Sequence, residues 1–205
     1  MLIQNKFISF EGIDGSGKTT QSKILADFLL DKKQSVLWTR EPGGTDVAEQ
    51  IREIVVKNKL SNLSELFLIM AARKEHIDHV INPALQNNHF VVCDRYIDST
   101  VAYQASSTLT MNDILDLHRK YMEKLMPTMT FYIEVSYEVA MERIKPRHTN
   151  DRFDNLGQNF FRKLELHYKM LSEKFQDRIF TIDGNREIEE LHHEVTKIVS
   201  EYYGI

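Results

Sequence analysis

Short apolar runs alternate with longer segments whose apolar residues recur at helical spacing. Five such runs are rich in β-branched and aromatic residues, a composition typical of buried strands: Phe7–Phe10, Ser35–Thr39, His89–Cys93, Thr128–Val135 and Arg178–Asp183. Helical patterns separate each run from the next. We therefore expect an α/β fold, with a five-stranded and mostly parallel sheet covered by helices on both faces.

The segments between these strands predict helices. The first covers Lys18–Leu30, and Thr45 and Asp46 can cap the second. A long helical pattern runs over Ser64–Gln86, further helices follow, and the last carries its apolar residues over Ile188–Tyr202. Neither a repeat nor an interdomain linker interrupts the pattern, so we expect a single domain over residues 1–205.

Composition narrows the class of protein. Hydrophobic residues make up 42% and charged residues 27% of the chain, and the net charge is −4, which argues against a broad nucleic-acid or membrane surface. The single cysteine, Cys93, excludes a disulfide framework and a multi-thiolate metal site. The longest apolar run, Leu66–Ala72, is too short for a membrane span, and the N-terminal residues lack a signal-peptide pattern. These features predict a cytoplasmic protein.

A phosphate-binding loop lies between the first strand and the first helix. Residues 12–19 read GIDGSGKT and fit the pattern G-x-x-x-x-G-K-[ST] in full. Glycines let backbone N–H groups wrap a phosphate, and the helix N-terminus adds positive potential. Lys18 would reach the β- and γ-phosphates, and the Thr19 hydroxyl would ligate Mg²⁺. The residues expected to bind ATP are Gly12, Ile13, Asp14, Gly15, Ser16, Gly17, Lys18 and Thr19.

The end of the third strand indicates which reaction follows. The strand leads into Asp94, which could hold Mg²⁺, and then Arg95, which can bind a phosphate but cannot activate water. The nearest match to a GTPase base-reading motif, Asn58–Ser61, lacks the required Asp. These features favour phosphoryl transfer to a phosphorylated acceptor over a partner-regulated ATPase switch. Other nucleoside monophosphate or deoxynucleoside kinases stay open as alternatives.

Several arginines belong to the expected acceptor side of the sheet. Arg40 follows the second strand, Arg52 lies on the next helix, Arg73 lies within the long helical segment, and Arg95 follows the third strand. The planar guanidinium donates two parallel hydrogen bonds to a phosphate monoester. Their gathering beside a phosphate loop predicts an anionic acceptor.

Five motifs together resemble the thymidylate kinase family. They are FEGIDGSGKTTQ (Phe10–Gln21), TREPGGT (Thr39–Thr45), AARKEH (Ala71–His76), DRYIDSTVAYQ (Asp94–Gln104) and DRFD (Asp151–Asp154). The resemblance implies a three-layer P-loop nucleoside monophosphate kinase fold. It also implies a homodimer that uses ATP and Mg²⁺ to convert dTMP to dTDP in dTTP biosynthesis.

The resemblance also implies roles for individual residues. Arg40, Arg52 and Arg95 would hold the dTMP phosphate, and Asp14 would contact the nucleotide near its sugar hydroxyl or phosphate. Those that would bind thymine are Arg73, Thr100 and Gln104. Tyr103 would pack near the deoxyribose and disfavour a 2′-OH. The catalytic groups would include Asp14, Lys18 and Arg95.

A polar segment after the fourth strand is expected to form a small lid over about residues 145–155. The phosphate loop has no Arg or Lys at its variable positions, as in the bacterial-type branch of the family, where the transferring phosphoryl receives a cation from a mobile lid. Of the cations Arg143, Lys145, Arg147 and Arg152, we favour Arg147 and Arg152 as catalytic.

The long helical segment departs from the family pattern at one position and carries a histidine pair that could suggest a metal site. Where the family usually has a Phe that stacks on thymine, this chain has Ile69, which we assign to the base site. Phe67 is expected in the core. His76 and His79 are three residues apart, and we expect a solvated helix face there rather than a metal site.

Overall fold

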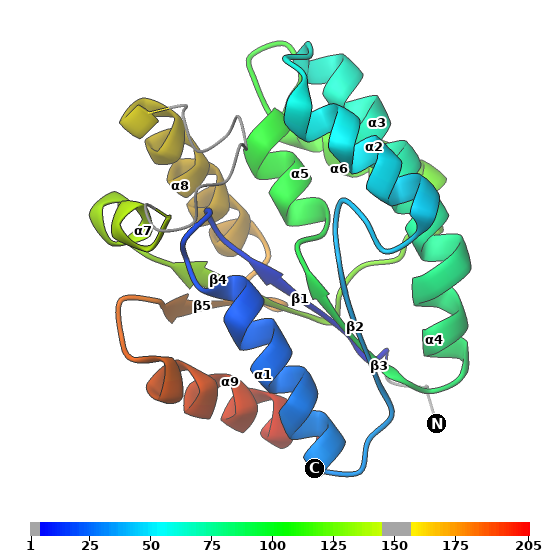
Figure 1. Cartoon of the computed structure of the whole chain (residues 1–205), viewed down its shortest axis with the longest axis vertical. Coiled ribbons are helices and arrows are strands. Elements are labelled where there is room, and N and C mark those ends of the chain that lie inside the picture. The colour runs from blue at the N-terminus through cyan, green and yellow to red at the C-terminus, as the bar shows by residue number, and fades with distance from the viewer. Residues whose placement is uncertain (1–4, 145–156) are drawn as a thin grey trace.

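The computed structural model describes residues 5–144 and 157–205, which form a three-layer α/β structure (Figure 1). All neighbouring strands are parallel, and their order in the sheet is β2-β3-β1-β4-β5. The strands are β1 (Phe7–Glu11), β2 (Val36–Arg40), β3 (Phe90–Asp94), β4 (Met129–Glu134) and β5 (Ile179–Asp183). The predicted fold class and all five strands are confirmed.

Helices flank both faces of this sheet (Figure 1). On one face α1 (Lys18–Asp31) and α9 (Ile188–Tyr203) pack together. The other helices are α2 (Asp46–Lys57), α3 (Asn62–His76), α4 (Asn82–Gln86), α5 (Ile97–Gln104), α6 (Met111–Tyr121), α7 (Tyr137–Ile144) and α8 (Gly157–Lys174). The expected long helix is nearly continuous, since a π-helical turn, η1 (Ile77–Ile81), joins α3 to α4.

Alternation along the strands divides the interior into two cores. On β1, Phe7 packs into the core beneath α3, α5, α6 and α8, whereas Ile8 and Phe10 pack beneath α1 and α9. All three side chains are fully buried. The same alternation places Glu11 on the Phe7 side of the sheet, so an acidic group ends a strand that is buried throughout.

The carboxyl ends of the strands meet at one edge of the sheet. Phe10 of β1 and Arg40 of β2 both pair with Asp94 of β3, which brings the ends of the three strands side by side. The chain passes from β1 to β2 on one side of the sheet, and from β3 across β1 to β4 on the other side. Ligands of open parallel sheets bind beyond the point where the strand order changes direction in this way. The motifs read from the sequence therefore converge here.

Two expectations about α3 were wrong. Phe67 is 56% exposed rather than part of the core, because it lies on the side of α3 that faces away from the sheet. His76 is fully buried rather than solvated, because α3 turns it toward Thr39 at the end of β2. Cys93 is buried, as expected.

Within residues 5–144 and 157–205, none of the helices combines the length and the apolar character needed to cross a membrane.

Candidate active site

The phosphate-binding loop runs very close to neighbouring backbone. Gly12 has φ 146° and Gly15 has φ 81°, conformations that favour glycine. A Cβ on Gly12 would lie 2.7 Å from the carbonyl oxygen of Ile133, and one on Gly15 would lie 2.4 Å from that of Ala140. Larger residues would therefore push the loop out of its path.

The first turn of α1 offers hydrogen-bond donors to an anion. Gly17 is the N-cap residue, and no side chain caps the helix. Ser16 Oγ is buried and makes no hydrogen bond to the residues that the structure describes. Free N–H groups at a helix N-terminus bind phosphate. This end of α1 is therefore built to receive one.

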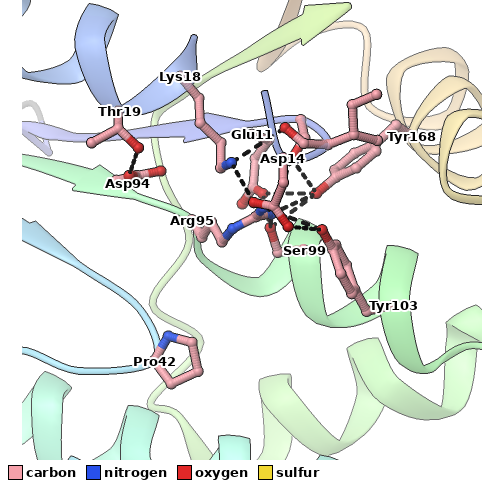
Figure 2. Close-up of polar contacts among 12 residues, drawn as sticks. Glu11, Asp14, Lys18, Thr19, Pro42, Asp94, Arg95, Ser99, Tyr103 and Tyr168 are labelled. Carbon is pink, nitrogen blue, oxygen red and sulfur yellow. Dashed lines mark hydrogen bonds and ion pairs between the residues drawn. The ribbon is translucent and has the colours of Figure 1, made fainter. Parts of the chain in front are cut away.

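Asp14 lies between two cations inside the loop (Figure 2). Its Oδ1 is 3.2 Å from Lys18 Nζ and 2.6 Å from Arg95 Nη2. Burial raises the pKa of Asp14, but the charges of Arg95 and Lys18 outweigh it and hold the pKa well below its usual range. Burial and the charge of Arg95 lower the pKa of Lys18. The aspartate is therefore ionised and fixes the two cations relative to each other.

Arg95 joins the phosphate loop to the helix that follows β3. Its backbone is left-handed, with φ 73°, and its N–H donates to the carbonyl oxygen of Phe10 at 2.9 Å. Nη1 donates to the carbonyl oxygen of Gly12 at 3.0 Å and to Ser99 Oγ at 2.9 Å. Nη2 donates to the Tyr103 hydroxyl at 3.2 Å. The guanidinium is thus held at the edge of the loop (Figure 2).

Beneath Arg95 lies an acid that the sequence reading missed. Glu11 accepts hydrogen bonds from the Tyr96 N–H at 2.7 Å and from the Ser99 hydroxyl at 2.5 Å. Tyr168 of α8 also reaches Ser99, with 2.9 Å between the two hydroxyl oxygens. Burial and the nearby charge of Asp98 raise the pKa of Glu11 to about 7. A glutamate that directly follows a run predicted to be a buried strand was the available signal.

Thr19 and Asp94 meet at the start of α1, on the other side of Lys18 from Tyr103 (Figure 2). The Thr19 hydroxyl donates to Asp94 Oδ2. Asp94 Oδ1 is buried without a hydrogen-bond partner among the described residues. Hydroxyl and carboxylate oxygens are the donor type that Mg²⁺ prefers, so this pair fits the ion predicted here.

A cavity opens beside the phosphate loop. The lining residues are Asp14, Glu41, Pro42, Arg52, Val55, Val56, Glu65, Ile69, Arg73, Arg95, Tyr96, Ser99, Thr100, Tyr103 and Gln104. Seven predicted acceptor-site residues lie in one cavity together with Asp14, although they come from four segments of the chain.

Arg73 is fixed by a buried acid that the sequence reading also passed over. Its Nε donates to Glu41 Oε2 at 2.7 Å, and its Nη2 donates to Thr100 Oγ1 at 2.7 Å. His76 Nδ1 lies 3.0 Å from the other oxygen of Glu41. Burial lowers the pKa of Arg73, yet the charge of Glu41 more than offsets it. The Glu beside Arg40 in the motif REPGG was a signal for this contact.

Gln104 and Ile69 line the part of the cavity near Arg73. Gln104 Nε2 donates to Glu65 Oε1 at 2.7 Å. Gln104 Oε1 is buried and accepts no hydrogen bond from the described residues. Ile69 of α3 lines the cavity, whereas Phe67 does not.

The other predicted site cations lie at the margin or outside the described chain. Arg40 pairs with Glu49 at 2.7 Å and is not among the residues lining the cavity. Arg52 lines the cavity and donates to the carbonyl oxygen of Pro42 at 3.3 Å. The lid residues Arg147 and Arg152 lie outside the described residues.

Comparisons with known proteins agree with this geometry. A family model for thymidylate kinase matches residues 10–195. A thymidylate kinase of Orientia tsutsugamushi is 46% identical over 201 residues, which cover 95% of this chain and 93% of the relative. One of Rickettsia rickettsii is 46% identical over 185 residues, which cover 90% and 91% of the two chains.

Solved structures give the same result. The crystal structure of thymidylate kinase from Ehrlichia chaffeensis superposes with a TM-score of 0.77 at 34% identity, covering 94% of this chain and 97% of the other. Relatives of this name do not favour the alternative readings of a different nucleotide kinase or an ATPase switch. The P-loop NTPase fold, the motifs and these matches together show that the chain belongs to the thymidylate kinase family.

Proposed function

We propose that the protein transfers the γ-phosphoryl group of ATP to dTMP, giving ADP and dTDP. The observation that carries this proposal is the position of Arg95. Its guanidinium contacts the carbonyl oxygen of Gly12 in the phosphate loop and also lines the neighbouring cavity. A cation shared by both regions suits two phosphates that meet there.

ATP is assigned to the phosphate loop and the first turn of α1. The uncapped N-terminus of α1 and Lys18 would hold its β- and γ-phosphates. Thr19 and Asp94 would hold Mg²⁺ there, directly or through water. When bound, that ion neutralises charge on the phosphates.

dTMP is assigned to the cavity, with its phosphate toward the loop. Arg95 and Arg52 would bind the phosphate, and Arg40 could join them if its ion pair with Glu49 opens. The Tyr103 hydroxyl donates to Asp14 Oδ2 at 3.3 Å, and both side chains would lie beside the deoxyribose. Arg73, Thr100 and Gln104 would face the thymine ring.

The reaction needs alignment more than acid–base chemistry. An oxygen of the dTMP phosphate attacks the γ-phosphorus of ATP, and the bond from that phosphorus to the β,γ-bridging oxygen breaks to release ADP. Lys18 and Arg95 would hold the donor and the acceptor on either side of the transferring group. Asp14 bridges these two cations and orients them.

Closure over this site is assigned to the segment at about residues 145–155. Arg147 and Arg152, which lie outside the described residues, are proposed to bring positive charge to the transferring phosphoryl. A cation delivered on closure acts mainly in the transition state, and closure would exclude water.

A homodimer is proposed on the basis of exposed apolar side chains on two packed helices. Val47 and Ile54 of α2 are 49% and 46% exposed, and Leu63 and Phe67 of α3 are 50% and 56% exposed. Each pair lies on one side of its helix, because the members are seven or four residues apart. Clusters of exposed apolar side chains mark association surfaces.

We propose that the protein acts in the cytoplasm, since ATP and dTMP are intracellular metabolites.

The test is a steady-state assay of ADP formation with a panel of acceptors. We expect rapid ATP consumption only when dTMP is present, and much slower turnover with dCMP, dGMP or UMP. A lack of stimulation by dTMP over the other nucleotides would remove the proposal. Slow hydrolysis that does not depend on an acceptor would instead indicate an ATPase.

A further inference from the structure

The amide of Gln104 is held in one orientation by a buried carboxylate. Glu65 and Gln104 line the same cavity, and Gln104 Nε2 donates to Glu65 Oε1 at 2.7 Å. Both residues are buried, at 6% and 2% exposure. An ionised carboxylate can only accept hydrogen bonds, so it must face the NH₂ end of the amide. The carbonyl end, Oε1, is therefore turned away from Glu65.

That carbonyl is the atom left without a hydrogen bond. Gln104 Oε1 is buried and has no partner among the residues described. A buried acceptor in this condition is costly, and a ligand that supplies a donor removes the cost. The cavity therefore favours a ligand with an N–H group at this point.

Arg73 presents the complementary chemistry from the same side of the cavity. Glu65, Ile69 and Arg73 are spaced four residues apart on α3, so one face of the helix carries all three toward the cavity. The guanidinium has only donors, and Glu41 and Thr100 fix its direction. Arg73 and Gln104 thus offer a donor and an acceptor on fixed supports.

This pair distinguishes pyrimidine bases by chemistry. Thymine and uracil have an N–H at N3 and a carbonyl group at C4. Cytosine has an unprotonated nitrogen at N3 and an amino group at C4. Its N3 acceptor would face the Gln104 carbonyl, which is also an acceptor, and its amino donor would face the Arg73 guanidinium, which is also a donor. Like pairs buried together leave both groups unsatisfied.

We propose that Glu65 is a positioning residue for base selection. It fixes the carbonyl end of Gln104 toward the base and so favours an N3–H pyrimidine over cytosine. This inference rests on the proposed function, because it assigns the cavity to the base of the acceptor nucleotide. Glu65 itself acts through Gln104.

The test is E65Q, assayed with dTMP and dCMP as acceptors. A glutamine at position 65 can either accept a hydrogen bond from Gln104 or donate one to it, so the side-chain amide of Gln104 is free to flip by about 180°. We expect the ratio of kcat/KM for dTMP over dCMP to fall roughly tenfold, mainly through a higher KM for dTMP. The value of kcat with saturating dTMP should stay near that of the unmodified protein, because Lys18 and Arg95 are untouched. If Glu65 had a purely structural role, E65Q would lower kcat/KM for dTMP and for dCMP by the same factor.

Glu75→Gln is the matched control, since Glu75 lies on the same helix, pairs with His79 at 3.4 Å and is not among the residues lining the cavity. It should leave the ratio unchanged. If E65Q does not fold, E65L is measured in the same way, because leucine leaves the Gln104 amide without an anchor. A fall of less than threefold in the folded variant overturns the positioning role. An unmodified protein that shows no preference for dTMP overturns the proposed function instead.

Discussion

Glu11→Gln is expected to stabilise the unliganded protein at neutral and alkaline pH. Glu11 is fully buried, and burial together with Asp98 raises its pKa from 4.5 to about 7. Holding the carboxylate charged in this place costs about 3 kcal/mol, because each tenfold change in a proton affinity corresponds to about 1.4 kcal/mol. Glutamine is neutral at every pH and can still accept from the Tyr96 N–H and donate to Ser99 Oγ.

The sign of the pH dependence follows from the direction of the shift. The Glu11 carboxyl binds its proton more tightly in the folded state than in the unfolded state, so its protonation stabilises the fold fully below about pH 4.5. That contribution is lost as the pH rises to about 7. The stability of Glu11→Gln relative to the unmodified protein should therefore increase across this window and level off above it. Above this window the free-energy difference of about 3 kcal/mol corresponds to a Tm higher by about 6–12 °C for a chain of this length.

Urea unfolding at fixed protein concentration, followed by the fluorescence of the single tryptophan, Trp38, measures this difference. Other groups that titrate in the same range cancel between the two proteins. Glu134→Gln is the matched control, because Glu134 ends the neighbouring strand β4 but is exposed. A free-energy difference for Glu11→Gln that is equal at pH 4 and pH 8 would refute the reasoning.

Three further substitutions test the phosphate sites and the dimer. Lys18→Ala should lower kcat about 100-fold or more through lost charge-assisted contacts, with an unchanged circular dichroism spectrum. Arg95→Ala should raise the KM for dTMP about 100-fold or more, and an unchanged KM contradicts its phosphate role. Phe67→Glu should yield monomers in sedimentation analysis, whereas Leu166→Glu, at the same 56% exposure on α8, should not. A dimeric Phe67→Glu contradicts the assigned surface.

Local sequence was sufficient wherever the chemistry comes from one segment of the chain. The phosphate loop is contiguous, and its glycines, Lys18 and Thr19 occur in an order that only one local geometry satisfies. The strands were predicted because short continuous apolar runs rich in β-branched and aromatic residues reflect burial on both faces of a sheet. Their ends were set one residue too early at Glu11, Arg40 and Asp94, since polar residues there look like loop residues.

The sequence could not show which distant side chains fix one another. Glu11 reaches Ser99, which is 88 residues away, and Glu41 reaches Arg73, which is 32 residues away. Glu65 reaches Gln104 across 39 residues. The local sequence around each of these acids does not identify its distant partner. Only the packing of α3 and α5 over the carboxyl ends of the strands buries them and gives each one a partner.

The sequence also misassigned one apolar side chain of α3. It identifies apolar positions, but it does not tell a face packed on the sheet from one left for another surface. Phe67 was therefore placed in the core, although its side chain is exposed, whereas Ile69, assigned to the base site, does line the cavity. The sequence by itself determined the fold class, the phosphate loop and the family motifs, because these depend on local pattern. Tertiary structure decided which charges are buried and which way they point, because burial and pairing depend on neighbours that the chain brings together only on folding.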